Sequence, residues 1–175
     1  MLTRVLSLDL ATRTGWAFTF CQTRSKFEYG IIQTNPKFSE GRRLALFREE
    51  LIKLLSKLKP THIVIEDTYA GNNIKTLKLL SKYAGVAIEC CSSMARVNPY
   101  IIHTSTVKAY FKVKNKKDLF DFMLSLLEWE DDKGISFEKH NDITDAIAQL
   151  LCYCDKILGL WKFRVEKEYG FLYNV

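Results

Sequence analysis

Four acidic residues occur where a folded chain could bring them together. Asp9 follows the apolar run VLSL, and Glu66 lies at the end of the apolar run in HIVIED. Asp142 and Asp145 are three residues apart in HNDITDAIAQ, a spacing that places both on one face of a helix. Crowded carboxylates cannot all ionise without cations, and hard oxygen ligands suit magnesium or manganese. Two such ions in one site serve phosphodiester chemistry, so the pattern predicts a metal site beside a nucleic-acid backbone.

Each acid taken singly also has a plainer interpretation. Asp9 can hydrogen-bond the turn at 11–14. Glu66 and Asp67 can pair with lysines, and Asp142 can stabilise the start of a helix through the macrodipole. The joint pattern favours a site, because two acids end apolar strands and the third position lies on an amphipathic helix.

Hydrophobic periodicity indicates the elements that must position these acids. We expect strands at 2–9, 15–20, 27–33, 62–67 and 99–103, and helices at 39–58, 74–90 and 118–128. Thr104 and Ser105 are expected to cap the fifth strand before a short helix through 108–111, and a last helix is expected from His140 or Asn141 to about Leu158. The first three strands form an antiparallel meander. A strand–helix–strand crossover then makes strand 62–67 parallel to the first strand, so Asp9 and Glu66 emerge at the same sheet edge. The order predicts a mixed α/β fold with a central sheet. The segment after Gly159 is expected to add an edge strand or to cover another subunit.

Composition predicts one domain, spanning residues 1–175, that binds a polyanion. The chain carries a net charge of +6 and 47% hydrophobic residues. Residues 104–117 hold five lysines and no acid, whereas residues 118–138 hold seven acids, which indicates a binding face beside a solvated face. The five cysteines form no C-x-x-C pair, so we expect neither a disulfide framework nor a zinc site. No signal peptide or membrane span is expected, which favours the cytoplasm.

Three segments resemble the motifs of the RuvC-type Holliday junction resolvases, within the ribonuclease H-like fold. They are LSLDLATRTGWA, IVIEDTYAGNN followed by LKLLSKYAGV, and HNDITDAIAQ, and the resemblance runs from Asp9 to Ala148. The short chain, the cysteine-bearing segment after Gly85 and the acidic insertion before His140 resemble the poxvirus branch. Asp67 departs from the family pattern, in which this position is usually not acidic.

The resemblance implies a ribonuclease H-like fold with a mixed five-stranded sheet, in which strands 1–3 are antiparallel and strands 4 and 5 lie parallel to strand 1. It implies that Asp9, Glu66, Asp142 and Asp145 are the catalytic, metal-binding carboxylates, with two Mg²⁺ ions that Mn²⁺ can replace and Asp9 between them. Lys108 resembles a family lysine near the scissile phosphate. The implied enzyme is a homodimer paired through the helix after Glu66. It cuts four-way and other branched DNA by paired nicks in the host cytoplasm, without a membrane or a small-molecule cofactor.

Further DNA contacts are expected from aromatic and basic residues. Tyr69 either belongs to the core or stacks on an unpaired base at a junction. The lysines are expected to be partly phosphate contacts and partly solvated side chains; they are Lys75, Lys78, Lys82, Lys112, Lys114, Lys116 and Lys117.

Two rival functions compete with a nuclease. DLATRTG also resembles the first phosphate loop of the actin-like ATPases, but no second glycine-rich loop follows Glu66. A catalytically silent DNA-binding protein is the other rival, and acids at all four positions speak against it.

Overall fold

A five-stranded mixed sheet forms the centre of the protein. A computed structural model describes residues 2–21, 27–67, 73–128, 134–160, 163–165 and 172–174. The sheet has the order β3-β2-β1-β4-β5. Its strands are β1 (Arg4–Asp9), β2 (Arg13–Phe20), β3 (Phe27–Gln33), β4 (His62–Glu66) and β5 (Tyr100–Ile102). The first three strands pair antiparallel, and β4 and β5 run parallel to β1, which confirms the predicted topology.

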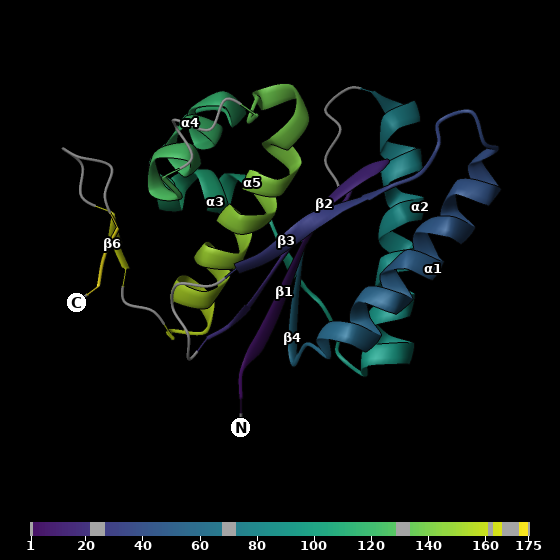
Figure 1. The fold of residues 1–175 in the computed structure, drawn as a ribbon, viewed down its shortest axis with the longest axis horizontal. Helices are drawn as coiled ribbons and strands as arrows, with labels where there is room; N and C mark the ends of the chain where they lie inside the picture. Colours follow the sequence, from purple (N-terminus) through teal and green to yellow (C-terminus); the bar gives the residue numbers. More distant parts are fainter. Residues whose placement is uncertain are drawn as a thin grey trace.

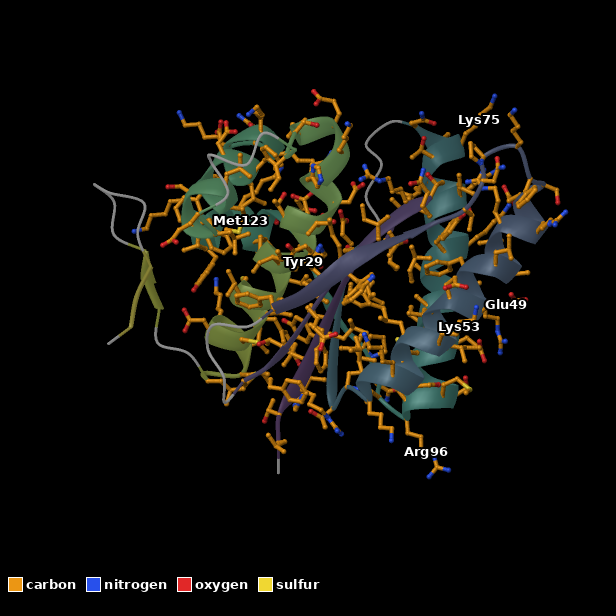
Figure 2. The ribbon with its side chains drawn as sticks, viewed as in Figure 1. Tyr29, Glu49, Lys53, Lys75, Arg96 and Met123 are labelled. Atoms are coloured by element: carbon orange, nitrogen blue, oxygen red, sulfur yellow. The ribbon has the colours of Figure 1, made fainter. Side chains whose placement is uncertain are left out.

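Helices cover both faces of this sheet (Figure 1). One face carries α1 (Glu40–Leu58), α2 (Ile74–Cys90) and the π-helical turn η1 (Cys91–Ala95). The other carries α3 (Thr104–Phe111), α4 (Lys116–Leu126), α5 (Phe137–Cys152) and the π-helical turn η2 (Tyr153–Ile157). Alternate strand residues feed the two cores, so Leu6 and Leu8 pack toward α1 and α2, whereas Val5 packs toward α5. Side chains fill the space between sheet and helices in Figure 2.

The helix that carries two of the four acids begins earlier than the sequence predicted. Residues from Phe137 onward are helical, and the backbone amide of His140 donates to the carbonyl oxygen of Ser136. The ring of Phe137 lies edge-on to Phe120 of α4, with 5.3 Å between ring centroids. This contact with α4 stabilises the extra first turn, so Asp142 lies in the second turn rather than at the helix start.

Smaller differences from the expected boundaries have local causes. Helix α4 begins at Lys116 and not at Asp118, because the Asn115 side chain accepts a hydrogen bond from the Asp118 amide and caps the helix there. Helix α1 begins directly after Ser39, whose side chain accepts a hydrogen bond from the Arg42 amide, and ends where Lys59 adopts a left-handed conformation.

The described part of the C-terminal segment forms its own sheet. Strands β6 (Phe163–Val165) and β7 (Leu172–Asn174) pair antiparallel with each other and are not part of the five-stranded sheet. Among the described residues, no helix has the length and apolar character that crossing a bilayer requires.

Candidate active site

Asp9 and Glu66 end two adjacent parallel strands at one edge of the sheet. Strands β1 and β4 pair in register up to Leu8 and Ile65, so the two acids follow at the same level. Asp9 is only 6% exposed and hydrogen-bonds the carboxyl group of Glu66. The adjacent turn does not use Asp9, because the Thr14 hydroxyl donates to the carbonyl oxygen of Ala11 at 2.8 Å. Asp9 is therefore part of an acid pair and not the residue that closes the turn.

Helix α5 brings the other two acids to this edge. It packs on β1 and β2, and Asp142 and Asp145 lie on the part of the helix nearest to Asp9. Gly15 of β2, the pairing partner of Asp9, permits this approach. A Cβ atom at Gly15 would lie 2.0 Å from the backbone oxygen of Asp142, so only glycine allows the two backbones to come so close.

Burial and like charge shift the titration of these carboxyl groups. Burial raises the pKa of Asp9 well above its usual value, and the hydrogen bond to Glu66 and the charges of Glu66 and Asp145 add to this effect. Burial also raises the pKa of Asp145 to about 6, although Lys116 opposes the shift. The pKa of Asp142 is raised by burial against the opposing charges of Lys116 and Arg13. The cluster is thus electrostatically unfavourable when fully ionised.

A lysine lies among the acids. The Lys116 ammonium group is 2.6 Å from a carboxylate oxygen of Asp145. Burial lowers the pKa of Lys116, but Asp145, Asp9 and Asp142 outweigh burial and raise it. From the sequence, Lys116 was expected to be a phosphate contact or a solvated side chain, because nothing in the lysine block distinguishes it from its neighbours.

Two neutral side chains hold Glu66, and the sequence predicted no site role for either of them. The Thr104 hydroxyl donates to one carboxylate oxygen of Glu66, and the Gln149 amide donates to the other at 3.3 Å. Gln149 is 2% exposed and accepts a hydrogen bond from Ser7 of β1 at 3.3 Å. Gln149 lies four residues after Asp145, on the same face of α5, which is the one signal that could have identified it.

Two hollows adjoin the acids. A cavity of about 70 Å³ is lined by Glu66, Thr104, Val107, Lys108, Lys116, Leu119, Asp145 and Gln149. A hollow of about 210 Å³ is lined by Asp9, Leu10, Ala11, Glu66, Asp67, Leu80, Lys116 and Asp142. Lys108 therefore lies near Glu66 and Asp145, and its role near a scissile phosphate stays a prediction.

The six other lysines expected to contact DNA line neither hollow. Exposed lysines on α2 are Lys75, Lys78 and Lys82, and exposed lysines around α4 are Lys112, Lys114 and Lys117. Two of them form ion pairs, Lys82 with Glu40 and Lys117 with Asp121. Tyr69 lies outside the described residues. Asp67 pairs with His103 at 2.9 Å and not with a lysine.

The donor set of the acid cluster fits a divalent cation. The buried oxygen Oδ1 of Asp145 has no hydrogen-bond partner. The acids of the cluster offer carboxylate oxygens, which are suitable ligands for a hard divalent cation. Among the described residues, no group of three or more His, Cys, Asp or Glu side chains is arranged to hold a metal ion. Coordination of one ion by three of these acids therefore requires their side chains to move closer together.

The fold and site define a class: a mixed α/β domain with an acidic cluster across the carboxyl ends of two parallel strands and a facing helix. No protein-family profile matches the chain. A relative described as crossover junction endodeoxyribonuclease RuvC, from Wolbachia sp. subsp. Brugia malayi, is 33% identical over 159 residues, which cover 87% of this chain and 94% of the relative. RuvC from Dictyoglomus thermophilum is 28% identical over 75% of this chain and 82% of the relative. The chain belongs to the RuvC family of crossover junction endodeoxyribonucleases.

Solved structures show the same fold at low sequence identity. Thermus thermophilus RuvC in complex with a Holliday junction substrate superposes with a TM-score of 0.70 at 14% identity, covering 90% of this chain and 97% of that chain. The yeast mitochondrial Holliday junction resolvase Ydc2 superposes with a TM-score of 0.67 at 15% identity, covering 91% and 80%. The expected RuvC-like fold is therefore confirmed.

Proposed function

We propose that this chain is a divalent-metal-dependent endonuclease that resolves four-way DNA junctions, and that Asp9, Glu66, Asp142 and Asp145 hold the metal. The observation that carries the proposal is the convergence of these carboxylates from β1, β4 and α5 on one sheet edge. Such crowding is costly unless cations neutralise it. Membership of the RuvC family supports four-way junctions as the substrate.

We assign separate roles to the side chains of the site. Thr104 and Gln149 orient Glu66, and Arg13 contacts Asp142 at 3.2 Å. To Lys108, which lines the same cavity as Glu66 and Asp145, we assign the binding of the phosphate. Asp9, Glu66, Asp142 and Asp145 would hold two Mg²⁺ ions, which Mn²⁺ could replace, and the ions would supply activation of a water and stabilisation of the leaving oxygen. For Asp9 we keep the role expected from the sequence, that of the ligand between the ions.

The decisive experiment is Asp142→Asn on a synthetic four-way junction. We expect the variant to lose cleavage in Mg²⁺, measured as nicked strands on a denaturing gel, while it still shifts the junction on a native gel. Asp121→Asn, which changes an exposed acid on α4, is the matched control and should cut normally. Cleavage by Asp142→Asn at the control rate would refute the metal assignment.

A homodimer paired through α2 is the second part of the proposal. Apolar side chains on α2 remain exposed in the single chain: Ile74 by 67%, Leu77 by 36% and Ile88 by 40%. Two active sites related by a two-fold axis account for paired, symmetric nicks. Leu77→Glu should yield a monomer in sedimentation, whereas Ile101→Glu on the edge strand β5 should not. A Leu77→Glu protein that sediments as the wild type does would argue against this surface.

The poxvirus affinity and the site of action in the host cytoplasm remain predictions from the sequence motifs. The relatives compared above support the family and not a branch within it.

A further inference from the structure

Arg13 links the start of β2 to the helix that carries two of the acids. One terminal nitrogen of its guanidinium donates to the backbone oxygen of Glu138 at 3.1 Å, and the other donates to the backbone oxygen of Lys139. The first nitrogen also lies 3.2 Å from a carboxylate oxygen of Asp142. One side chain thus contacts the first turn of α5 and the acid in its second turn.

A second contact, two residues further along β2, holds the same part of α5. A Cβ atom at Gly15 would lie 2.0 Å from the backbone oxygen of Asp142 and 3.0 Å from the backbone nitrogen of Ile143. Gly15 also pairs with Asp9 across the sheet. The backbone contact sets how near α5 comes to β2 at Asp142, and Arg13 adds polar contacts to the turn of the helix that precedes it.

We propose that Arg13 is a positioning residue that fixes the first two turns of α5 and thereby the distance of the Asp142 carboxylate from Asp9. The inference rests on the proposed function, because it takes Asp142 as a metal ligand. Only a planar guanidinium presents several donors in a fixed fork, so a lysine at this position keeps the charge but cannot hold both backbone oxygens and the carboxylate.

A purely electrostatic role for Arg13 predicts the opposite effect on metal binding. A positive charge beside Asp142 repels a cation, so removing that charge would strengthen metal binding if charge were all that mattered. Loss of positioning weakens metal binding instead, because the ligand is no longer held at the site. The direction of the change in affinity therefore distinguishes the two roles.

The test compares Arg13→Gln and Arg13→Lys with Arg96→Gln as the matched control. Arg96 is exposed at the end of the molecule opposite Lys75 (Figure 2). The probes are Mg²⁺ alone and Ca²⁺ alone, titrated by calorimetry without DNA. We expect Arg13→Gln to bind Mg²⁺ about 10-fold more weakly, as is usual when a group that orients a metal ligand is removed. Arg13→Lys should recover only part of this loss, and Arg96→Gln should match the wild type.

Hydrogen exchange supplies a readout that does not depend on metal. Backbone amides of residues 140–145 should exchange faster in both Arg13 variants than in the control, because the first turns of α5 lose two anchors. Unchanged or tighter Mg²⁺ binding by Arg13→Gln would overturn the proposal, and so would full recovery by Arg13→Lys. If Arg13→Gln fails to fold, the calorimetry and exchange of Arg13→Lys decide alone. Absence of Mg²⁺ binding by the wild type would instead overturn the proposed function.

Discussion

Replacing Asp145 with Asn should stabilise the protein when divalent metal is absent. The Asp145 residue is only 7% exposed, and its pKa is raised from 3.8 to about 6 even though Lys116 lies beside it. The native state at pH 7.5 therefore contains an ionised carboxylate that would be more stable protonated. A shift of about two pKa units corresponds to about 3 kcal/mol, which Asn removes because it resembles the neutral acid. For a chain of this size, the melting temperature should rise by about 6 to 12 °C.

The pH dependence follows from the direction of the same shift. An acid with a raised native pKa favours the folded state most below its unfolded pKa, and that contribution is lost as pH rises through the native pKa. In EDTA, the melting temperature of the wild type should therefore fall between pH 5 and pH 7.5. Asp145→Asn should flatten the dependence, although Asp9 and Asp142, whose pKa values are also raised, preserve part of it.

Differential scanning calorimetry in EDTA, at pH 5 and pH 7.5, measures both effects. Asp121→Asn is the control, because Asp121 and its partner Lys117 are both more than half exposed and such a pair contributes little. Mg²⁺ should raise the melting temperature of the wild type far more than that of Asp145→Asn. An Asp145→Asn variant less stable than the wild type at pH 7.5 in EDTA would show that the Lys116 ion pair outweighs burial, and the reasoning would be refuted.

Two further substitutions probe the surroundings of the acids. Gly15→Ala should destabilise the protein by about 1 to 3 kcal/mol and reduce junction cleavage, because the added Cβ pushes α5 away from β2. The control is Gly41→Ala on α1, where a Cβ meets nothing within 4 Å, and this variant should cut normally. Equal urea midpoints of unfolding for the two variants would contradict the close contact at Gly15. Lys116→Met should lower the stability in EDTA at pH 7.5 by about 1 to 2 kcal/mol, since the Lys116 side chain is about half exposed and water screens its charge. The loss should shrink at pH 5 as the acids protonate. An equal loss at both pH values would show that the variant removes packing of the lysine stem and not its charge.

The sheet and the convergence of Asp9 with Glu66 were predictable from the sequence. Each acid directly ends a short apolar strand, and the intervening helix forces the two strands to run parallel. Placing Asp142 and Asp145 required only a helical spacing and an apolar face on the same helix. These inferences succeed because strand and helix periodicities are local properties of the chain.

The groups that orient the acids were not predictable, because they depend on tertiary contacts. Gln149 reaches Glu66 across 83 residues of sequence, and Thr104 reaches it across 38. Lys116 is one of five lysines in a short segment, and its proximity to Asp145 arises from the packing of α4 against α5. The early start of α5 has the same origin, since it depends on the contact of Phe137 with Phe120.

The neighbouring acids Glu66 and Asp67 show how position separates residues of the same type. Glu66 ends β4 and is held by Thr104 and Gln149 among buried groups. The Asp67 amide continues the pairing with β5 by donating to the backbone oxygen of Ile102 at 2.8 Å, and its side chain lines the hollow that Glu66 also lines. The Asp67 side chain is nevertheless 41% exposed and pairs with the exposed His103, where water screens its charge. Two acids that are adjacent in the sequence therefore differ in what compensates their charge. The charge of Glu66 is compensated by neighbouring groups, whereas the charge of Asp67 is screened by solvent.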